Sequence, residues 1–136
     1  MAMQKNFHDA FHRHYHDAGL LLQNRRWANA DHLYGLCAEC GLKAILITQG
    51  VTSNADHDIA DRTYKQHINT LWNEYHSFMQ KGRVYLIPAV NPFDTWQVDQ
   101  RYAGEKDITE QTARDHGTAV EAIAKIINQA ELDGVL

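Results

Sequence analysis

The chain has 136 residues, of which 44% are hydrophobic and 22% are charged. This composition is ordinary for one globular domain, and it excludes an intrinsically disordered chain as the main state. The 13 basic and 17 acidic side chains give a formal net charge of −4, which disfavours a nucleic-acid binder that depends on overall positive charge. We therefore expect a single domain over residues 1–136 whose partners are recognised by local sites.

No apolar run approaches the roughly 18 residues that a membrane-spanning helix needs. The segment from Phe7 to Asp17 is rich in His, Arg and Asp, where a secretory signal peptide would carry its apolar region. We expect a cytoplasmic protein with no membrane partner. Cys37 and Cys40 form a C-x-x-C motif without a second pair to complete a zinc site, and at helical spacing we expect two packed thiols.

Apolar residues at intervals of three and four, the spacing of one helical face, predict four helices. The first is expected from Gln4 to Gln23, and the second from Trp27 to Thr48, ending near Gly50. The second is apolar on nearly all sides towards its end, so we expect it to be the central, most buried helix.

In the second half of the chain, the pattern predicts a long third helix from Ile59 to Met79. Asp107 and Glu110, three residues apart, resemble a capping pair, and we expect the fourth helix to follow. Between them we expect an extended segment packed on the bundle, followed by an ordered loop or short helix. Four helices without paired strands predict an all-α, antiparallel bundle of four to five helices.

Three histidines of the first predicted helix, His8, His12 and His16, are spaced four residues apart and share one edge of that helix. Two imidazoles at this spacing are a common ligand pair for a divalent metal. A zinc site needs further ligands from other helices. The sequence offers His32, His57, His67, His76 and His116. The alternative interpretation is the polar edge of an amphipathic helix.

Two pairs of arginine and histidine could support metal-independent RNA cleavage, in which the arginine binds phosphate and the histidine moves protons. One pair is Arg62 and His67, and the other is Arg26 and His32, with Arg25 beside it. On a continuous third helix, Arg62 and His67 would lie about 140° apart, which opposes their joint action. The alternative is that Arg62 is solvated and that His67 caps the helix or borders the core.

Glu39 and Lys43 lie four residues apart on the predicted central helix, in the order that favours an ion pair. A carboxylate buried there needs a cationic partner, and we expect Arg101 or Arg26 to supply it. We therefore expect Glu39 to matter for stability more than for ligand binding.

Five segments of the chain resemble the HEPN domain (higher eukaryotes and prokaryotes nucleotide-binding), a family of small all-α bundles. Residues 15–22 (YHDAGLLL), 26–33 (RWANADHL) and 38–46 (AECGLKAIL) are similar to the family's A-x-x-L-L helix, short turn and second helix with A-x-E-x-x-L-K-A-L. Residues 65–71 (KQHINTL) resemble its H-D-L-x-x-L segment, and residues 96–102 (WQVDQRY) its R-Y element. The resemblance covers nearly the whole chain and implies a HEPN-like bundle.

The resemblance also implies a dimer-forming module of toxin–antitoxin, anti-phage or stress-defence systems. Its expected partners are RNA, a nucleotide or another protein, often a nucleotidyltransferase. Some family members are ribonucleases with R-x(4–6)-H near the start of the last helix, where this sequence has Arg114 and His116 only two residues apart. A homodimer is expected for a second reason, because Trp72, Trp96 and Tyr102, with the small-residue face of the fourth helix, exceed what one bundle must hide.

Three functions therefore stay open at the level of sequence, and none of them requires an organic cofactor. The leading interpretation is a HEPN-like binding module with weak catalysis or none. The second is a metal-independent ribonuclease that uses an arginine and histidine pair. The third is a histidine-rich metal-binding protein.

Overall fold

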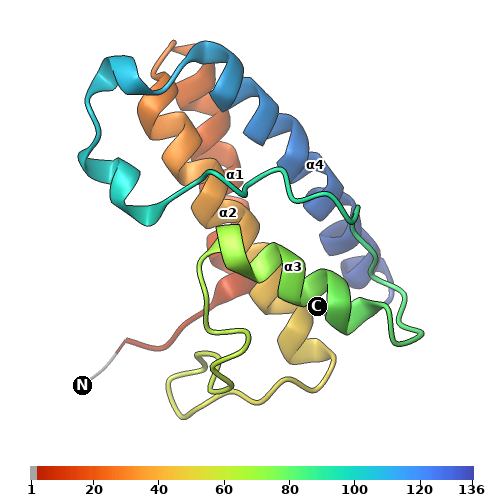
Figure 1. The fold of residues 1–136 in the computed structure, drawn as a ribbon. Helices are drawn as coiled ribbons and strands as arrows, with labels where there is room; N and C mark the ends of the chain where they lie inside the picture. The colour runs from red at the N-terminus through yellow and green to blue at the C-terminus, as the bar shows by residue number, and fades with distance from the viewer. Residues whose placement is uncertain (1–2) are drawn as a thin grey trace.

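The computed structural model describes residues 3–136, which form an all-helical fold (Figure 1). The helices in chain order are α1 (Phe7–Gln23), α2 (Trp27–Thr48), α3 (Ile68–Met79), the short 3-10 helices η1 (Val98–Tyr102) and η2 (Glu105–Asp107), and α4 (Glu110–Leu132). Within residues 3–136, extended backbone pairs only at an isolated bridge between Ser53 and Ile59. The prediction of an all-α protein is confirmed. None of the described helices is long and apolar enough to cross a membrane.

Helix α2 is the centre of the fold, as its composition predicted, and α1, α3 and α4 all pack against it. Two of its glycines allow neighbours to approach closely. A Cβ atom at Gly35 would lie 2.0 Å from Cε2 of Trp96, and one at Gly41 would lie 2.5 Å from Cγ2 of Ile123. Any larger residue at these positions would have to push its neighbour away.

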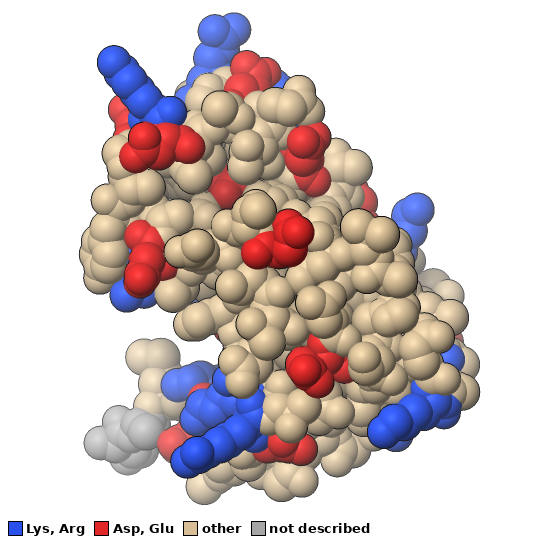
Figure 2. Space-filling view, in the orientation of Figure 1, with Lys and Arg blue, Asp and Glu red and all other residues tan. Residues whose placement is uncertain are grey.

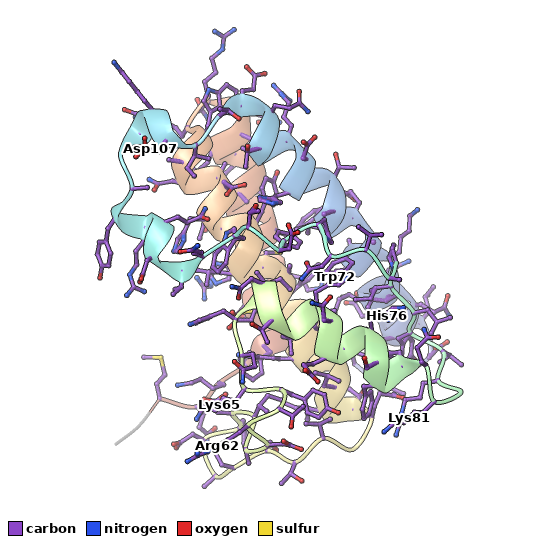
Figure 3. All side chains as sticks on the ribbon, in the orientation of Figure 1. Arg62, Lys65, Trp72, His76, Lys81 and Asp107 are labelled. Carbon is purple, nitrogen blue, oxygen red and sulfur yellow. The ribbon has the colours of Figure 1, made fainter. Side chains whose placement is uncertain are left out.

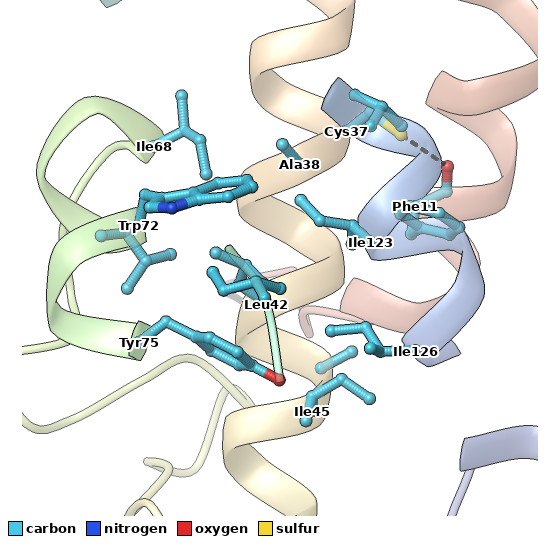
Figure 4. Close-up of a cluster of buried hydrophobic side chains, with 14 of the residues drawn as sticks. Phe11, Cys37, Ala38, Leu42, Ile45, Ile68, Trp72, Tyr75, Ile123 and Ile126 are labelled. Carbon is cyan, nitrogen blue, oxygen red and sulfur yellow. Dashed lines mark hydrogen bonds between the residues drawn. The ribbon is translucent and has the colours of Figure 1, made fainter. Parts of the chain in front are cut away.

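The bundle buries its own large aromatic side chains. Figure 4 shows Trp72 of α3 beside Leu42 of α2, with Ile123 of α4 in the same apolar cluster. Trp72 and Trp96 are each 1% exposed, so the expectation that they exceed what one bundle must hide is wrong. Tyr102 differs from them, because 77% of it is exposed.

The small-residue face of α4 is also used inside the monomer. A Cβ atom at Gly117 would lie 3.0 Å from the ring of Tyr34 on α2, so this glycine lets the two helices meet. Ala113, Val120 and Ile127 on the same face are buried. This face therefore gives no separate argument for a dimer.

The third helix is shorter than predicted. It begins at Ile68, because side chains in the preceding segment bind backbone N–H groups and stabilise turns instead of a helix. Asn54 accepts from the backbone of Asp56 and Asp58, and Asp61 accepts from Thr63. Ile59 is fully buried although it lies in a loop, so it gave the same apolar signal as a buried helical residue.

The starts of α1 and α4 are set by side-chain caps that the sequence analysis did not identify. Asn6 accepts from the backbone N–H of Asp9 at 3.0 Å, and so α1 begins at Phe7 and not at Gln4. Thr109 accepts from the backbone N–H of Thr112 at 3.1 Å and caps α4. The side chain of Asp107, which we expected to cap this helix, instead accepts from Gly104 in the preceding turn.

The segment between α3 and η1 is extended and packs on the bundle, as expected. The hydroxyl of Tyr75 donates to the carbonyl of Tyr85 at 2.7 Å, and Nε1 of Trp72 donates to the carbonyl of Pro88 at 2.9 Å. These two bonds fix the segment along α3. They satisfy backbone carbonyls that have no strand to pair with.

Candidate functional site

The N-terminal end of α2 opens into a small polar pocket of about 230 Å³. The pocket is lined by Arg26, Ala28, Asn29, Ala103 and Glu105. Arg26 is the N-cap residue of α2, and no side chain caps this helix. Residues of the first turn of a 22-residue helix and its N-cap arginine thus line the same pocket, and the end of a helix with free N–H groups attracts anions.

An exposed tyrosine adjoins one of the pocket's lining residues in the amino-acid sequence. Tyr102 immediately precedes the lining residue Ala103, and the guanidinium carbon of Arg101 lies 4.7 Å from the centre of the Tyr102 ring. Figure 2 shows that basic and acidic side chains are intermingled on the visible face, without a continuous basic surface. Recognition of an anion would therefore depend on this local group of residues.

A buried polar network holds η1 against α2. Gln100 donates to Oδ2 of Asp31 at 2.6 Å, and Nε1 of Trp96 donates to the backbone carbonyl of Asp31 at 3.2 Å. The Oδ1 atom of Asp31 lies 2.5 Å from Nδ1 of His116, whose Nε2 donates to the carbonyl of Pro92 at 3.0 Å. The network thus positions the segment that carries Arg101 and Tyr102 beside the end of α2.

This network could not be foreseen from the sequence. Asp31 has no role assigned from the sequence, and His116 is considered there only as a possible metal ligand and as a histidine too close to Arg114 for the ribonuclease motif. The available signal was a polar residue at a position where the helical pattern of α2 or α4 requires burial, which predicts a buried partner. That signal does not say which two residues meet.

His32 lies outside the pocket that Arg26 lines. Its ring stacks on Trp96, with ring centres 5.6 Å apart, and its buried Nδ1 has no hydrogen-bond partner among the described residues. Burial lowers the pKa of His32 below its usual value, and the nearby charge of Arg101 lowers it further. The two residues therefore do not share a site: Arg26 lines the pocket, whereas His32 is a packed, neutral histidine outside it.

Glu39 is partnered by residues other than those we expected. Its Oε2 accepts from Nζ of Lys43 at 2.9 Å, which confirms the predicted ion pair, and its Oε1 accepts from Nδ1 of His67 at 3.0 Å. Neither Arg101 nor Arg26 forms a salt bridge with Glu39. His67 can reach α2 because it is the N-cap of α3, where the chain meets the central helix.

Arg62 and His67 are not on one continuous helix, so the angular objection to their joint action does not apply. Arg62 lies in the irregular segment before α3, where Figure 3 shows it beside Lys65 at the end of the molecule far from Asp107. No hydrogen bond joins Arg62 to His67 among residues 3–136. His67 is half-exposed, with 53% of its side chain accessible, and Arg62 is exposed.

The histidines of α1 meet a carboxylate from α4. Nε2 of His8 lies 3.2 Å and Nε2 of His12 lies 3.3 Å from the same oxygen, Oε2 of Glu131. These three residues form a group in which every potential ligand atom lies within 4.8 Å of the others. His16 is outside the group, and the further ligand is a glutamate and not one of the other histidines.

The two cysteines are packed thiols, as predicted. Cys37 is fully buried and its Sγ donates to the carbonyl of Phe11 at 3.4 Å. Burial raises the pKa of Cys37 and raises that of Cys40 to about 12. Both groups are therefore protonated at neutral pH, the unreactive state of a thiol.

Comparisons of the chain with known protein families, with characterised proteins and with solved structures found no match. Local geometry that bears on function occurs at three places: the end of α2, the Glu39 and His67 pair, and the group of His8, His12 and Glu131. The resemblance to HEPN domains remains a sequence-based expectation.

Proposed function

We propose that this protein is a HEPN-like binding module that takes the phosphate group of a nucleotide or RNA at the N-terminal end of α2. The observation that carries the proposal is the pocket of about 230 Å³ in which an uncapped helix end and Arg26 occur together. Phosphate oxygens accept hydrogen bonds from free backbone N–H groups, and the helix dipole favours their negative charge. The arginine adds a charge-assisted, bidentate contact.

The pocket is small, so a base or ribose attached to the phosphate would lie outside it. Tyr102 offers the nearest exposed aromatic surface, because it adjoins the lining residue Ala103. Stacking on such a ring is typical of proteins that bind single-stranded RNA. Arg101 adds positive charge beside the ring. The proposed ligand is therefore a phosphate that carries an accessible nucleobase.

Glu105 opposes an anion, because it places a carboxylate in the pocket lining. The same carboxylate would limit nonspecific binding of inorganic phosphate. We therefore propose a ligand that gains enough from base stacking to offset this repulsion.

The experiment that tests the proposal measures the binding of a short, dye-labelled RNA with a 5′-phosphate by fluorescence anisotropy at low salt. We expect Arg26→Gln to weaken binding by about tenfold, the value of one lost charge-assisted contact. The matched control is Arg25→Gln, which removes the same charge from the neighbouring residue outside the pocket lining. Equal losses in the two variants would indicate nonspecific attraction and would contradict the proposal.

Self-association and a nucleotidyltransferase-type protein partner belong to the same proposal through the resemblance to HEPN domains. The surface that supports a protein contact is the extended segment after α3, where Val84, Leu86 and Val90 are exposed. Light scattering measures the mass directly. A mass of 15.6 kDa at all concentrations would exclude the homodimer.

A second function, metal-independent RNA cleavage, is favoured by the contact between Glu39 and His67. The buried carboxylate holds Nδ1 of His67, and this leaves Nε2 on a half-exposed ring, an arrangement suited to a general base. Arg62 on the preceding segment would bind the phosphate. Cleavage that continues in EDTA and is lost in a folded His67→Ala variant would support this function. Cleavage that is unchanged in that variant would exclude it.

A further inference from the structure

We propose that His8, His12 and Glu131 form a site for a divalent first-row transition metal, of which Zn²⁺ is the simplest representative. This site is independent of the phosphate pocket, because it lies where the start of α1 meets the end of α4. The two histidines come from successive turns of α1 and the glutamate comes from the last turns of α4.

The distances match a tetrahedral shell. Bonds of about 2.0–2.1 Å from zinc to nitrogen or oxygen place neighbouring ligand atoms about 3.3 Å apart. The Oε2 atom of Glu131 lies 3.2 Å from Nε2 of His8 and 3.3 Å from Nε2 of His12. A metal ion could therefore contact all three atoms with small movements of half-exposed side chains.

The chemistry of the three groups selects the class of cation. Two imidazoles and one carboxylate suit Zn²⁺ and its neighbours in the transition series, whereas Mg²⁺ and Ca²⁺ prefer sites made only of oxygen. Neutral imidazoles and one ionised carboxylate carry a single negative charge, which partly offsets that of the cation. Three protein ligands leave the fourth tetrahedral position for water or another small ligand.

The site also borders a surface cavity near the start of α1. His8 lines a cavity of about 720 Å³, together with apolar residues such as Phe7 and Ile47 and polar residues such as Ser53. A small molecule in this cavity would lie beside one of the proposed ligands. His8 thus belongs both to the proposed site and to the wall of this partly apolar cavity.

Metal binding would join two helices that are distant in sequence. Glu131 follows His8 by 123 residues and His12 by 119 residues. A cation that binds the folded arrangement and not the unfolded chain raises the melting temperature, by an amount that grows with the logarithm of its concentration relative to the dissociation constant.

The experiment titrates Zn²⁺ into the tag-free, full-length protein by calorimetry, and Co²⁺ is used as a spectroscopic probe of coordination geometry. We expect one equivalent to bind, an intense visible absorption of tetrahedral Co²⁺, and a higher melting temperature with Zn²⁺. The His12→Gln and Glu131→Gln variants are each expected to lose about tenfold or more in affinity, because each lacks one of three ligands.

The matched control is His16→Gln, which removes a histidine one turn further along α1 and outside the group. This variant should bind Zn²⁺ as the unaltered protein does. Melting in EDTA shows whether each variant is folded. The proposal is overturned if the folded wild-type protein binds no Zn²⁺, or if His16→Gln loses as much affinity as Glu131→Gln.

Discussion

The Nδ1 atom of His116 lies 2.5 Å from the Oδ1 atom of Asp31, in a buried contact between α4 and α2. Both nitrogens of this histidine face acceptors, because its Nε2 donates to the carbonyl of Pro92. Asp31 also accepts from Gln100. The pair is therefore the centre of a buried network that joins two helices, the extended loop and η1, and little solvent is available to replace a lost partner.

We predict that Asp31→Ala lowers the free energy of unfolding by about 1–3 kcal/mol, the usual cost of leaving a buried polar group such as Nδ1 of His116 without its hydrogen-bond partner. Urea denaturation followed by circular dichroism measures the change. The control is Asp99→Ala, which removes an exposed carboxylate from η1. Equal, small effects in the two variants would show that the Asp31 and His116 contact adds little to stability.

A second prediction concerns the ion pair inside α2. Glu39→Gln should destabilise the protein strongly, because it leaves Nζ of the buried Lys43 with one neutral acceptor and weakens the bond to His67. The double variant Glu39→Gln with Lys43→Met removes both charges and should recover part of the loss. The denaturation midpoints of the single and double variants give their relative stabilities. If the double variant is less stable than the single variant, charge burial is not the cause.

A third prediction concerns pH. Folding lowers the pKa of His32, first through burial and then through the charge of Arg101, so the folded state disfavours the protonated ring. Between pH 7 and pH 5 the unfolded chain binds this proton more readily, because an unperturbed histidine has a pKa of about 6.5. Stability therefore falls as the pH falls through this window.

The His32→Gln variant lacks this titration. We expect it to lose less stability than the unaltered protein between pH 7 and pH 5, as measured by urea denaturation at both values. Burial, the largest cause of the lowered pKa of His14, is present in both proteins, and His32 is the smallest of its causes, so most of the His14 contribution cancels in the comparison. The same loss in both proteins would contradict the assignment to His32.

A fourth prediction separates the two parts of the proposed phosphate site. Tyr102→Ala should weaken the binding of a labelled RNA by about 1–3 kcal/mol, the usual value of stacking one base on an aromatic ring. It should leave the binding of inorganic pyrophosphate unchanged, because that ligand has no base. Calorimetry with both ligands measures the difference. A loss for both ligands would place Tyr102 in phosphate binding.

Glu105→Gln should act in the opposite direction. The substitution removes a negative charge from the pocket lining and keeps the shape of an exposed side chain. We expect the affinity for the RNA and for pyrophosphate to rise by a few-fold, since a neighbouring like charge at the surface costs up to about 1 kcal/mol. An unchanged affinity for both ligands would place the phosphate elsewhere.

The parts of the structure that follow from local pattern were predicted well. The periodicity of α2 identified its bounds from Trp27 to Thr48, and the spacing of Glu39 and Lys43 identified their ion pair. The third helix was predicted wrongly because the pattern counted Ile59 as helical. Burial of a loop residue produces the same apolar signal as burial of a helical one, and only the turns around Asn54 and Asp61 distinguish them.

The sequence by itself determined the all-α class, the central helix, the packed cysteines and the pair of histidines on one edge of α1, because each depends on neighbours within about two helical turns. The tertiary structure alone decided that Glu131 joins His8 and His12, that His67 partners Glu39, and that Asp31 meets His116. These contacts join residues that lie 28 to 123 positions apart. Their partners are set by how the helices cross and pack, which no local spacing encodes.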